Sequence, residues 1–233
     1  MKKLIALTLA VAAIIPSISA KTITESRSIK AFDKLEVSSA VNVKYVQGTP
    51  VSLKITGSEE DVAKTKIKQS GGKLKIWCSD NRRMNFGRSR SVSVTVTTPV
   101  INEIDLDGAC SFTAKRLGTN GKVEIEVSGA SNVDITDLKA GDVEIDCNGS
   151  SNLKIVRSST RKIELEVSGA SNATIAGSTG YLDLECSGAS KASLGNLSAK
   201  SGEVEVSGAS RATTNITNLR KADKSGASTH KNR

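Results

Sequence analysis

Residues Val123–Ala130 read VEIEVSGA, and the chain repeats this stretch several times with small changes. Ile163–Ala170 reads IELEVSGA, Leu182–Ala189 reads LDLECSGA, Gly202–Ala209 reads GEVEVSGA, and Val143–Ser150 (VEIDCNGS) is a weaker copy. The glycines of these copies follow one another at intervals of 19 to 21 residues. A fixed period of about 20 residues is typical of a solenoid, in which each repeat forms one turn.

Apolar and acidic residues alternate strictly within each copy. In the first copy Val123, Ile125 and Val127 enclose Glu124 and Glu126. Such alternation predicts a strand with one buried face and one solvated face. The segment after each glycine also alternates, and no helical pattern of about ten residues occurs in the repeats. The sequence therefore predicts an all-β fold, a single-stranded parallel β-helix in which equivalent strands stack about 4.8 Å apart.

The first 20 residues have the pattern of a secretory signal. Lys2 and Lys3 precede the apolar run Leu4–Ile15, and small residues follow up to Ala20. An apolar run of this length is too short to span a bilayer, and the small residues suit cleavage after Ala20. We therefore expect an exported protein, in the periplasm, at the cell surface or secreted. No later apolar run approaches the length of a spanning helix, so no transmembrane helix is expected.

The mature chain is expected to form one parallel β-helix domain over residues 21–228, followed by a basic tail at residues 229–233. Residues 21–100 are less regular and are expected to form the first turns and a cap, while residues 101–228 hold the regular repeats. Ser58, followed by three acidic residues, predicts the start of a short helix.

Four cysteines in an exported chain would ordinarily suggest two disulfides. The repeat argues against this, because Cys147 and Cys186 occupy the same column two turns apart, with Val167 between them. That separation is roughly 9.6 Å by the strand spacing, and a disulfide needs Cα atoms within about 7 Å. Cys110 occupies a corner position that serine fills in other turns. The sequence therefore predicts four free thiols, although it assigns no role to Cys78.

The acidic positions form two columns along the predicted solenoid. Oxygen ligands in such columns suit Ca²⁺, which makes a calcium ladder one reading of this face. The other reading is a solvated negative face, partly compensated by nearby lysines. The ladder's candidate ligands are Glu124, Glu126, Glu144, Asp146, Glu164 and Glu166. The glycine- and aspartate-rich calcium repeat is absent from the sequence. The leading prediction is therefore that the chain binds no metal and no other cofactor.

The stretch from Arg82 to Arg90 is the best candidate for a ligand-binding loop. It is a basic interruption between two strand-like segments, in which arginines could pair with carboxylates or sulfates and an aromatic ring could stack on a sugar. Its candidate residues are Arg82, Arg83, Phe86, Arg88 and Arg90. The alternative is a mobile surface hairpin. Asn132, Asn152 and Asn172 align in another column, for which a structural ladder is the preferred reading.

Composition argues against catalysis and against nucleic-acid binding. The single histidine, His230, lies near the end of the chain, so no histidine-based triad or metal cluster can form. The acids recur on every turn, and no pair stands out as a catalytic couple. Only 3% of the residues are aromatic, which leaves no stacking platform for bases, although the formal net charge is +9.

Several of these features together resemble one exported family, the putative auto-transporter adhesins with a head GIN domain. They are the N-terminal signal, the lead-in Phe32–Val37 (FDKLEV), Thr98-Pro99 before the repeats, and the repeated strand-Ser-Gly-Ala-Ser units. The resemblance covers nearly the whole mature chain and implies a right-handed β-helix with an adhesive role.

We therefore expect a non-enzymatic binding protein that contacts glycans or envelope proteins, with self-association possible through an exposed β-face. A polysaccharide lyase or hydrolase on the same fold is the first alternative, and a passive spacer is the second.

Overall fold

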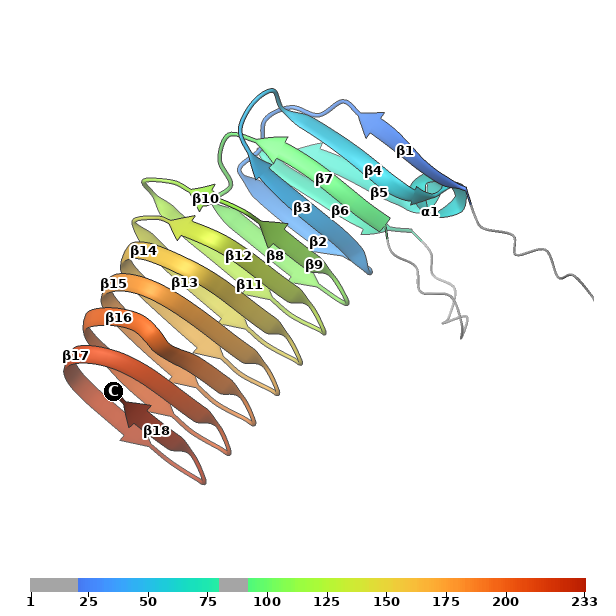
Figure 1. Cartoon of the computed structure of the whole chain (residues 1–233). Helices are drawn as coiled ribbons and strands as arrows, with labels where there is room; N and C mark the ends of the chain where they lie inside the picture. Colours follow the sequence, from blue (N-terminus) through green and yellow to red (C-terminus); the bar gives the residue numbers. More distant parts are fainter. Residues whose placement is uncertain (1–20, 80–91) are drawn as a thin grey trace, which may run out of the picture.

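The computed structural model describes residues 21–79 and 92–233, so the expected signal peptide lies outside the described residues. The described chain is about 70% strand and 3% helix, and it forms a β-solenoid of about six turns with a spacing of about 20 residues. The turns stack into one column, with strands β1 to β7 gathered at one end (Figure 1). The predicted fold class is confirmed.

The regular turns contribute strands to two faces of the solenoid. Strands β11, β12 and β13 show the pattern, since β11 pairs in parallel with β13 and β12 with the first part of β14. Each later turn is one long strand that bends from one face to the other. The strands of this region are β8 (Glu103–Asp107), β9 (Ser111–Ala114), β10 (Leu117–Gly118), β11 (Lys122–Val127), β12 (Asn132–Lys139), β13 (Asp142–Cys147), β14 (Asn152–Val167), β15 (Asn172–Cys186), β16 (Lys191–Val206), β17 (Arg211–Lys224) and β18 (Thr229–Asn232).

The core consists of the inward columns of these strands. Ile104, Ile125 and Ile145 are cross-strand partners on successive turns, and each is almost completely buried. Burial of one such side chain contributes about 1.5–3 kcal/mol. Cys147 and Cys186 occupy the predicted column on either side of Val167, and all four cysteines are free, as predicted.

The Ser-Gly-Ala-Ser corners close each turn through backbone and hydroxyl bonds to the preceding turn. The amide of Ala170 donates to the carbonyl of Gly149 at 2.7 Å. The buried hydroxyl of Ser190 donates to the carbonyl of Val167 at 2.9 Å. A buried hydroxyl is costly unless it is paired. Ser190 and Ser210 meet this requirement at the last corner position, whereas the buried hydroxyl of Ser151 has no hydrogen-bond partner among the described residues.

The N-terminal part extends both faces in an order that differs from the order in the chain. Its elements are β1 (Thr22–Arg27), β2 (Lys34–Ser38), β3 (Val41–Gln47), β4 (Ser52–Ser58), β5 (Thr65–Ser70), β6 (Lys73–Cys78) and β7 (Val92–Thr98). Strands β2 and β3 form a turn that lies between β8–β9 on one side and β6–β7 on the other. Antiparallel β5 then continues one face, and antiparallel β4 and β1 continue the other.

The predicted short helix is confirmed as α1 (Glu59–Lys64), with Ser58 as its N-cap. The hydroxyl of Ser58 accepts a hydrogen bond from the amide of Asp61 at 3.1 Å, which satisfies one of the free donors of the first turn. At the other end, the guanidinium of Arg27 donates to the carbonyls of Val62 and Thr65. Val62 is buried, so the helix packs its apolar side against the N-terminal strands.

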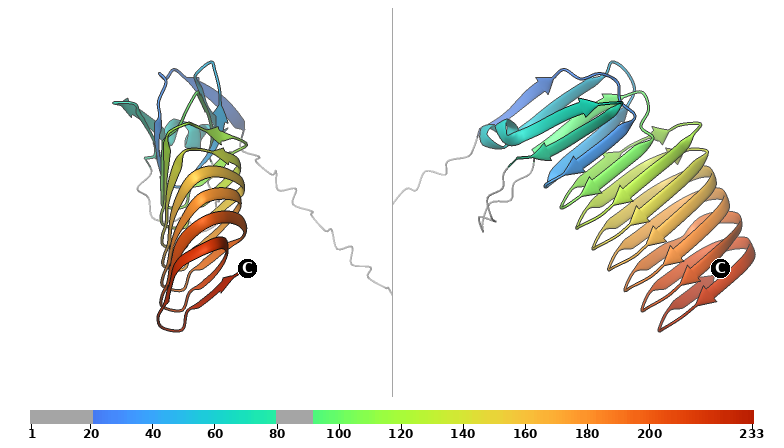
Figure 2. Two further views of the ribbon diagram at one scale, coloured as in Figure 1. Left: turned by 90° about the vertical axis from the view of Figure 1, so that its left-hand side faces the viewer. Right: turned by 180° about the vertical axis from the view of Figure 1, so that it is seen from behind.

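The last residues form a strand where the sequence suggested a basic tail. Strand β18 pairs in parallel with the start of β17 (Figure 2). The side-chain amide of Asn232 donates to the carbonyl of Ile216, and its oxygen accepts from the Ile216 amide, each at 2.8–2.9 Å. Asn232 thus holds β18 against β17. In the described part of the chain, no helix is long and apolar enough to cross a bilayer.

Candidate functional site

The solvated face formed by β8, β11, β13 and the second halves of β14 to β16 holds two columns of carboxylates. The first carboxylate column is Glu103, Glu124, Glu144, Glu164, Asp183 and Glu203. The second carboxylate column is Asp105, Glu126, Asp146, Glu166, Glu185 and Glu205. Both columns arise because alternate residues of a strand point to the same face, and parallel register places equivalents side by side.

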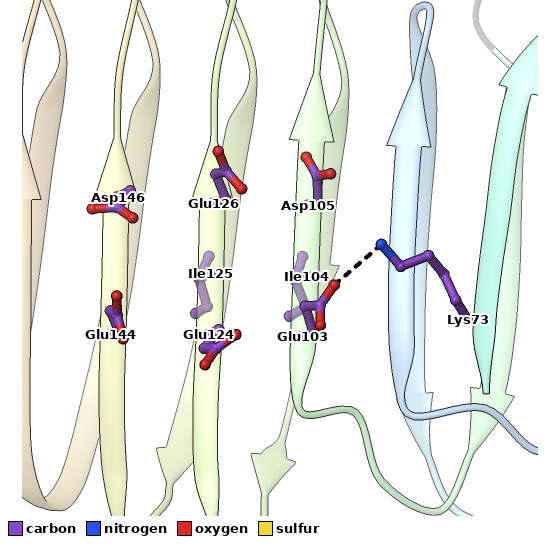
Figure 3. A pocket seen from close by; sticks show the side chains of 9 residues that line it. All are labelled: Lys73, Glu103, Ile104, Asp105, Glu124, Ile125, Glu126, Glu144 and Asp146. Carbon is purple, nitrogen blue, oxygen red and sulfur yellow. Dashed lines mark ion pairs between the residues drawn. The ribbon is translucent and has the colours of Figure 1, made fainter. Parts of the chain in front are cut away.

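A shallow depression of about 390 Å³ lies where both columns begin, and seven of its lining residues are charged (Figure 3). Lys73 reaches over it from β6 and approaches Glu103 at 3.2 Å. The other lining residues are Ile104, Asp105, Glu124, Ile125, Glu126, Glu144 and Asp146. The structure therefore brings together four of the six predicted calcium-ladder residues, and Glu164 and Glu166 continue the same columns on β14.

Lysines neutralise most of the first carboxylate column. Lys34 contacts Glu103 at 2.6 Å, and its hydrogen bond lowers the pKa of that carboxyl. Lys122 bridges Glu124 at 2.7 Å and Glu144 at 2.6 Å, which raises the pKa of the lysine. On the next turn, Lys162 pairs with Glu164. This column is consequently close to electrically neutral over four turns.

The second carboxylate column forms no ion pair within the described residues. Burial, followed by repulsion from Glu126, raises the pKa of Asp105. Burial and the neighbouring Glu144 raise the pKa of Asp146, and burial with Glu185 raises that of Glu166. Carboxylates stacked about 4.8 Å apart repel one another. The second column therefore carries negative charge that no ion pair with a described residue neutralises.

The carboxylates are arranged as columns rather than as converging ligands. Within residues 21–79 and 92–233, no group of three Asp, Glu, His or Cys side chains has the geometry to hold a metal ion. Ca²⁺ prefers six to eight converging oxygen ligands. Calcium binding by the ladder stays an untested hypothesis.

The opposite face is polar, and we call it the amide face; its asparagine column continues with Lys191 and Arg211 on β16 and β17. One outward column is formed by Asn42, Ser111, Asn132, Asn152 and Asn172, and the neighbouring one by Lys44, Thr113, Asp134, Lys154 and Thr174. Asn132, Asn152 and Asn172 are exposed, and no side-chain hydrogen bond joins these three amides. The predicted register of the asparagines is confirmed, but their amides are free to bind other groups.

The remaining candidates are placed as follows. The segment with Arg82, Arg83, Phe86, Arg88 and Arg90 lies outside the described residues, so its role in binding stays a prediction. His230 is half-buried at the end of the interior, where its Nε2 lies 2.8 Å from the Thr214 hydroxyl. Burial, followed by the charge of Lys224, lowers the pKa of this imidazole.

One surface feature was missed from the sequence, namely a basic region on the carboxylate face. Strands β5, β6 and β2 place the following lysines there: Lys66, Lys68, Lys73, Lys75 and Lys34. Alternating lysines at positions 66 and 68, and at 73 and 75, were a signal for a shared face. The order in which these strands join the sheet could not be read from that signal.

These features define a β-solenoid with long, charged or amide-bearing faces and shallow surface depressions. The chain belongs to the family described as "Putative auto-transporter adhesin, head GIN domain", which matches residues 31–231. The resemblance seen in the sequence is thereby confirmed.

Solved structures share the fold at low sequence identity. A protein described as a putative adhesin from Bacteroides fragilis NCTC 9343 is 22% identical, with a TM-score of 0.78 over 92% of this chain and 98% of that one. A protein described as a putative lipid-binding protein from Parabacteroides distasonis ATCC 8503 is 16% identical, with a TM-score of 0.77 over 91% and 96%. A further putative adhesin, from Parabacteroides merdae ATCC 43184, is 16% identical, with a TM-score of 0.71 over 91% and 96%. No match was found among curated proteins.

Proposed function

We propose that the chain is an exported, non-enzymatic binding protein that presents its amide face to a glycan of the cell envelope. The observation that carries the proposal is the row of exposed amides on successive turns, Asn132, Asn152 and Asn172. Each amide offers two donors and an acceptor, which suits a ligand rich in hydroxyl groups. The adhesin-like description of the family and of its structural neighbours is consistent with this role.

The repeat gives the proposed contact its strength. Equivalent side chains recur about every 4.8 Å along the axis, a spacing comparable to the length of one sugar unit. Each hydrogen bond contributes only about 0.5–1.5 kcal/mol, so a single turn would bind weakly. One polysaccharide molecule that contacts several turns of the solenoid would bind with a higher overall affinity through multivalency. A long polysaccharide is therefore favoured over a short oligosaccharide.

The test is co-sedimentation of the exported chain with a panel of bacterial and host polysaccharides, with polysaccharide chain length measured in the same samples. Retention without shortening supports the proposal. Shortening would establish the alternative of a glycan-active enzyme. If the chain is not retained and the polysaccharide is not shortened, the glycan proposal is overturned. The chain would then be a spacer or would bind a protein ligand.

Variants on the two faces locate the contact. The triple substitution Asn132→Ala, Asn152→Ala and Asn172→Ala should weaken retention by at least about tenfold, since it removes three side chains that could each hydrogen-bond. The matched control, Glu166→Gln, Glu185→Gln and Glu205→Gln, changes three exposed residues of the opposite face and should leave retention unchanged. Equal loss in both variants would contradict binding through the amide face.

A further inference from the structure

The carboxylate face is one continuous sheet surface with a basic end and an acidic end. The second carboxylate column continues without a break from Asp105 to Glu36 on β2, Lys75 on β6 and Lys68 on β5. The first column likewise continues from Glu103 to Lys34 and Lys73. The three strands β5, β6 and β2 therefore carry lysines together with Glu36. The next three, β8, β11 and β13, carry carboxylates, which Figure 3 shows beside Lys73 of β6.

Ion pairs within the chain do not balance this separation of charge. Lys75 pairs with Glu36, and Lys34 and Lys73 both contact Glu103. Lys68 is exposed and forms no ion pair with a described residue. At the other end, Asp105, Glu126 and Asp146 form none within the described chain. The unpaired charges of the face are thus positive on β5 and negative on β8, β11 and β13.

We propose that this face binds the same face of a second copy of the chain. The two-fold axis would run along the strands, between β2 and β8. Rotation about such an axis reverses the order of the strands and preserves their direction, so each column faces its own equivalent. Strand β2 then lies over β8 of the other copy, β6 over β11, and β5 over β13.

Charge complementarity favours this arrangement over others. It sets Lys75 opposite Glu126, Lys73 opposite Glu124, and Lys68 opposite Asp146. Beside the axis, Lys34 lies opposite Glu103, and Glu36 lies opposite Asp105 as the one contact between like charges. The symmetry makes each of these contacts twice. An axis in the face but perpendicular to the strands would place each strand over its own equivalent, with carboxylates over carboxylates. Like charges brought together in that way are strongly unfavourable. A second copy fits the face because opposite charges meet at four of the five positions where charged residues face each other.

The extent of the face predicts a weak dimer. Six strands about 4.8 Å apart and about five residues long cover about 500 Å² on each partner. Stable interfaces bury about 800 Å² per partner, and smaller ones belong to transient complexes. The dimer should therefore depend on protein concentration and on ionic strength. Both dependences can be measured.

The experiment uses sedimentation velocity of the exported chain over a range of concentrations. At low ionic strength the chain should show a reversible monomer–dimer equilibrium, and in roughly 1 M NaCl, where the Debye length is about 3 Å, dimerisation should weaken at least about tenfold. The variant Lys68→Glu with Lys75→Glu should be monomeric by itself. So should the variant Glu126→Lys with Asp146→Lys.

A mixture of the two variants gives the decisive result. In a mixed dimer, the reversed basic end of one variant faces the reversed acidic end of the other, and the unaltered ends also face each other. The mixture should therefore dimerise again at low ionic strength. Failure of the mixture to dimerise, while both variants keep the wild-type circular dichroism spectrum, would overturn the proposal. So would a wild-type chain that stays monomeric at low ionic strength.

A matched control separates the proposed register from general charge effects. Glu185→Lys with Glu205→Lys reverses two residues of the second carboxylate column on β15 and β16, outside the six overlapping strands. This variant should dimerise as the wild type does. Its loss of dimerisation would show that the overlap is wrong. If only an added cationic peptide such as oligolysine bound the face, the partner would be a different basic molecule and the proposed dimer would be refuted.

Discussion

Substitution of Gly169 by alanine tests whether the close stacking of corners limits the stability of the solenoid. Gly169 has φ of 71°, and a Cβ atom built on it would lie 2.5 Å from the carbonyl oxygen of Gly149 on the preceding turn. The left-handed conformation costs an L-residue about 1–2 kcal/mol. The contact also forces the two turns apart, which weakens the hydrogen bond from Ala170 to Gly149, worth about 0.5–1.5 kcal/mol.

The two effects together predict a loss of about 1.5–3.5 kcal/mol in the free energy of unfolding. For a chain of this size, 1 kcal/mol lowers Tm by about 2–4 °C, so Gly169→Ala should lower Tm by roughly 3–14 °C. Gly71→Ala is the matched control, because Gly71 has φ of 59° but a Cβ atom added to it would have no heavy atom within 4 Å. The control should lose only the conformational part, about 1–2 kcal/mol.

Thermal unfolding followed by circular dichroism, under identical conditions for both variants, measures the difference. Equal decreases in Tm would refute the argument, since they would show that the contact with Gly149 adds nothing to the cost of the left-handed conformation. A larger decrease for Gly71→Ala would refute it as well. A larger decrease for Gly169→Ala would establish corner stacking as a determinant of stability.

Three further predictions concern cysteines, pH and calcium. Maleimide at about pH 8 should modify Cys78 in the folded chain, whereas Cys110, Cys147 and Cys186 should react only after unfolding. Those three are buried, and burial raises the pKa of Cys147 to about 11. Mass spectrometry counts the labels, and rapid labelling of all four cysteines would contradict the buried core. The pKa of His230 is lowered in the folded state, so the unfolded chain binds more protons between that pKa and the ordinary value of about 6.5, and stability should fall as pH falls through this window. Hydrogen exchange of β18 should show this loss of stability. A pH dependence that persists in His230→Gln would exclude this histidine as its source. Added Ca²⁺ or a chelator should leave Tm unchanged, because the carboxylates do not converge; a rise in Tm with Ca²⁺ would support the ladder as a metal site.

Much of the fold could be predicted because the determining signal is local and repeated. The alternation in Val123–Val127 decides which side chains are buried, whatever the distant context. The corner sequence decides where each turn ends, since glycine accepts a positive φ and serine can pair its buried hydroxyl. With a constant period, these two local rules also predict which residues share a column, including Cys147 and Cys186. That is why the free cysteines and the asparagine register followed from the sequence.

The candidate surfaces needed contacts between residues far apart in the chain. Lys34 and Glu103 are 69 positions apart, and they meet because the turn formed by β2 and β3 stacks directly on β8 and β9. Strands β6 and β7 come later in the chain than that turn, yet they pack on its far side. No periodic pattern encodes this order, because it depends on which exposed strand edges pair after the chain reverses direction at β4, α1 and β5.

The end of the chain shows the same division. The composition of the final residues indicates only a basic segment, whereas the structure places them in β18, which two hydrogen bonds of Asn232 hold against β17. The sequence by itself determined the period, the inward and outward columns and the corners, since each depends on neighbouring residues. Only the tertiary structure decided the order of the first turns, and with it the basic end of the carboxylate face, because strand pairing over long separations places those charges together.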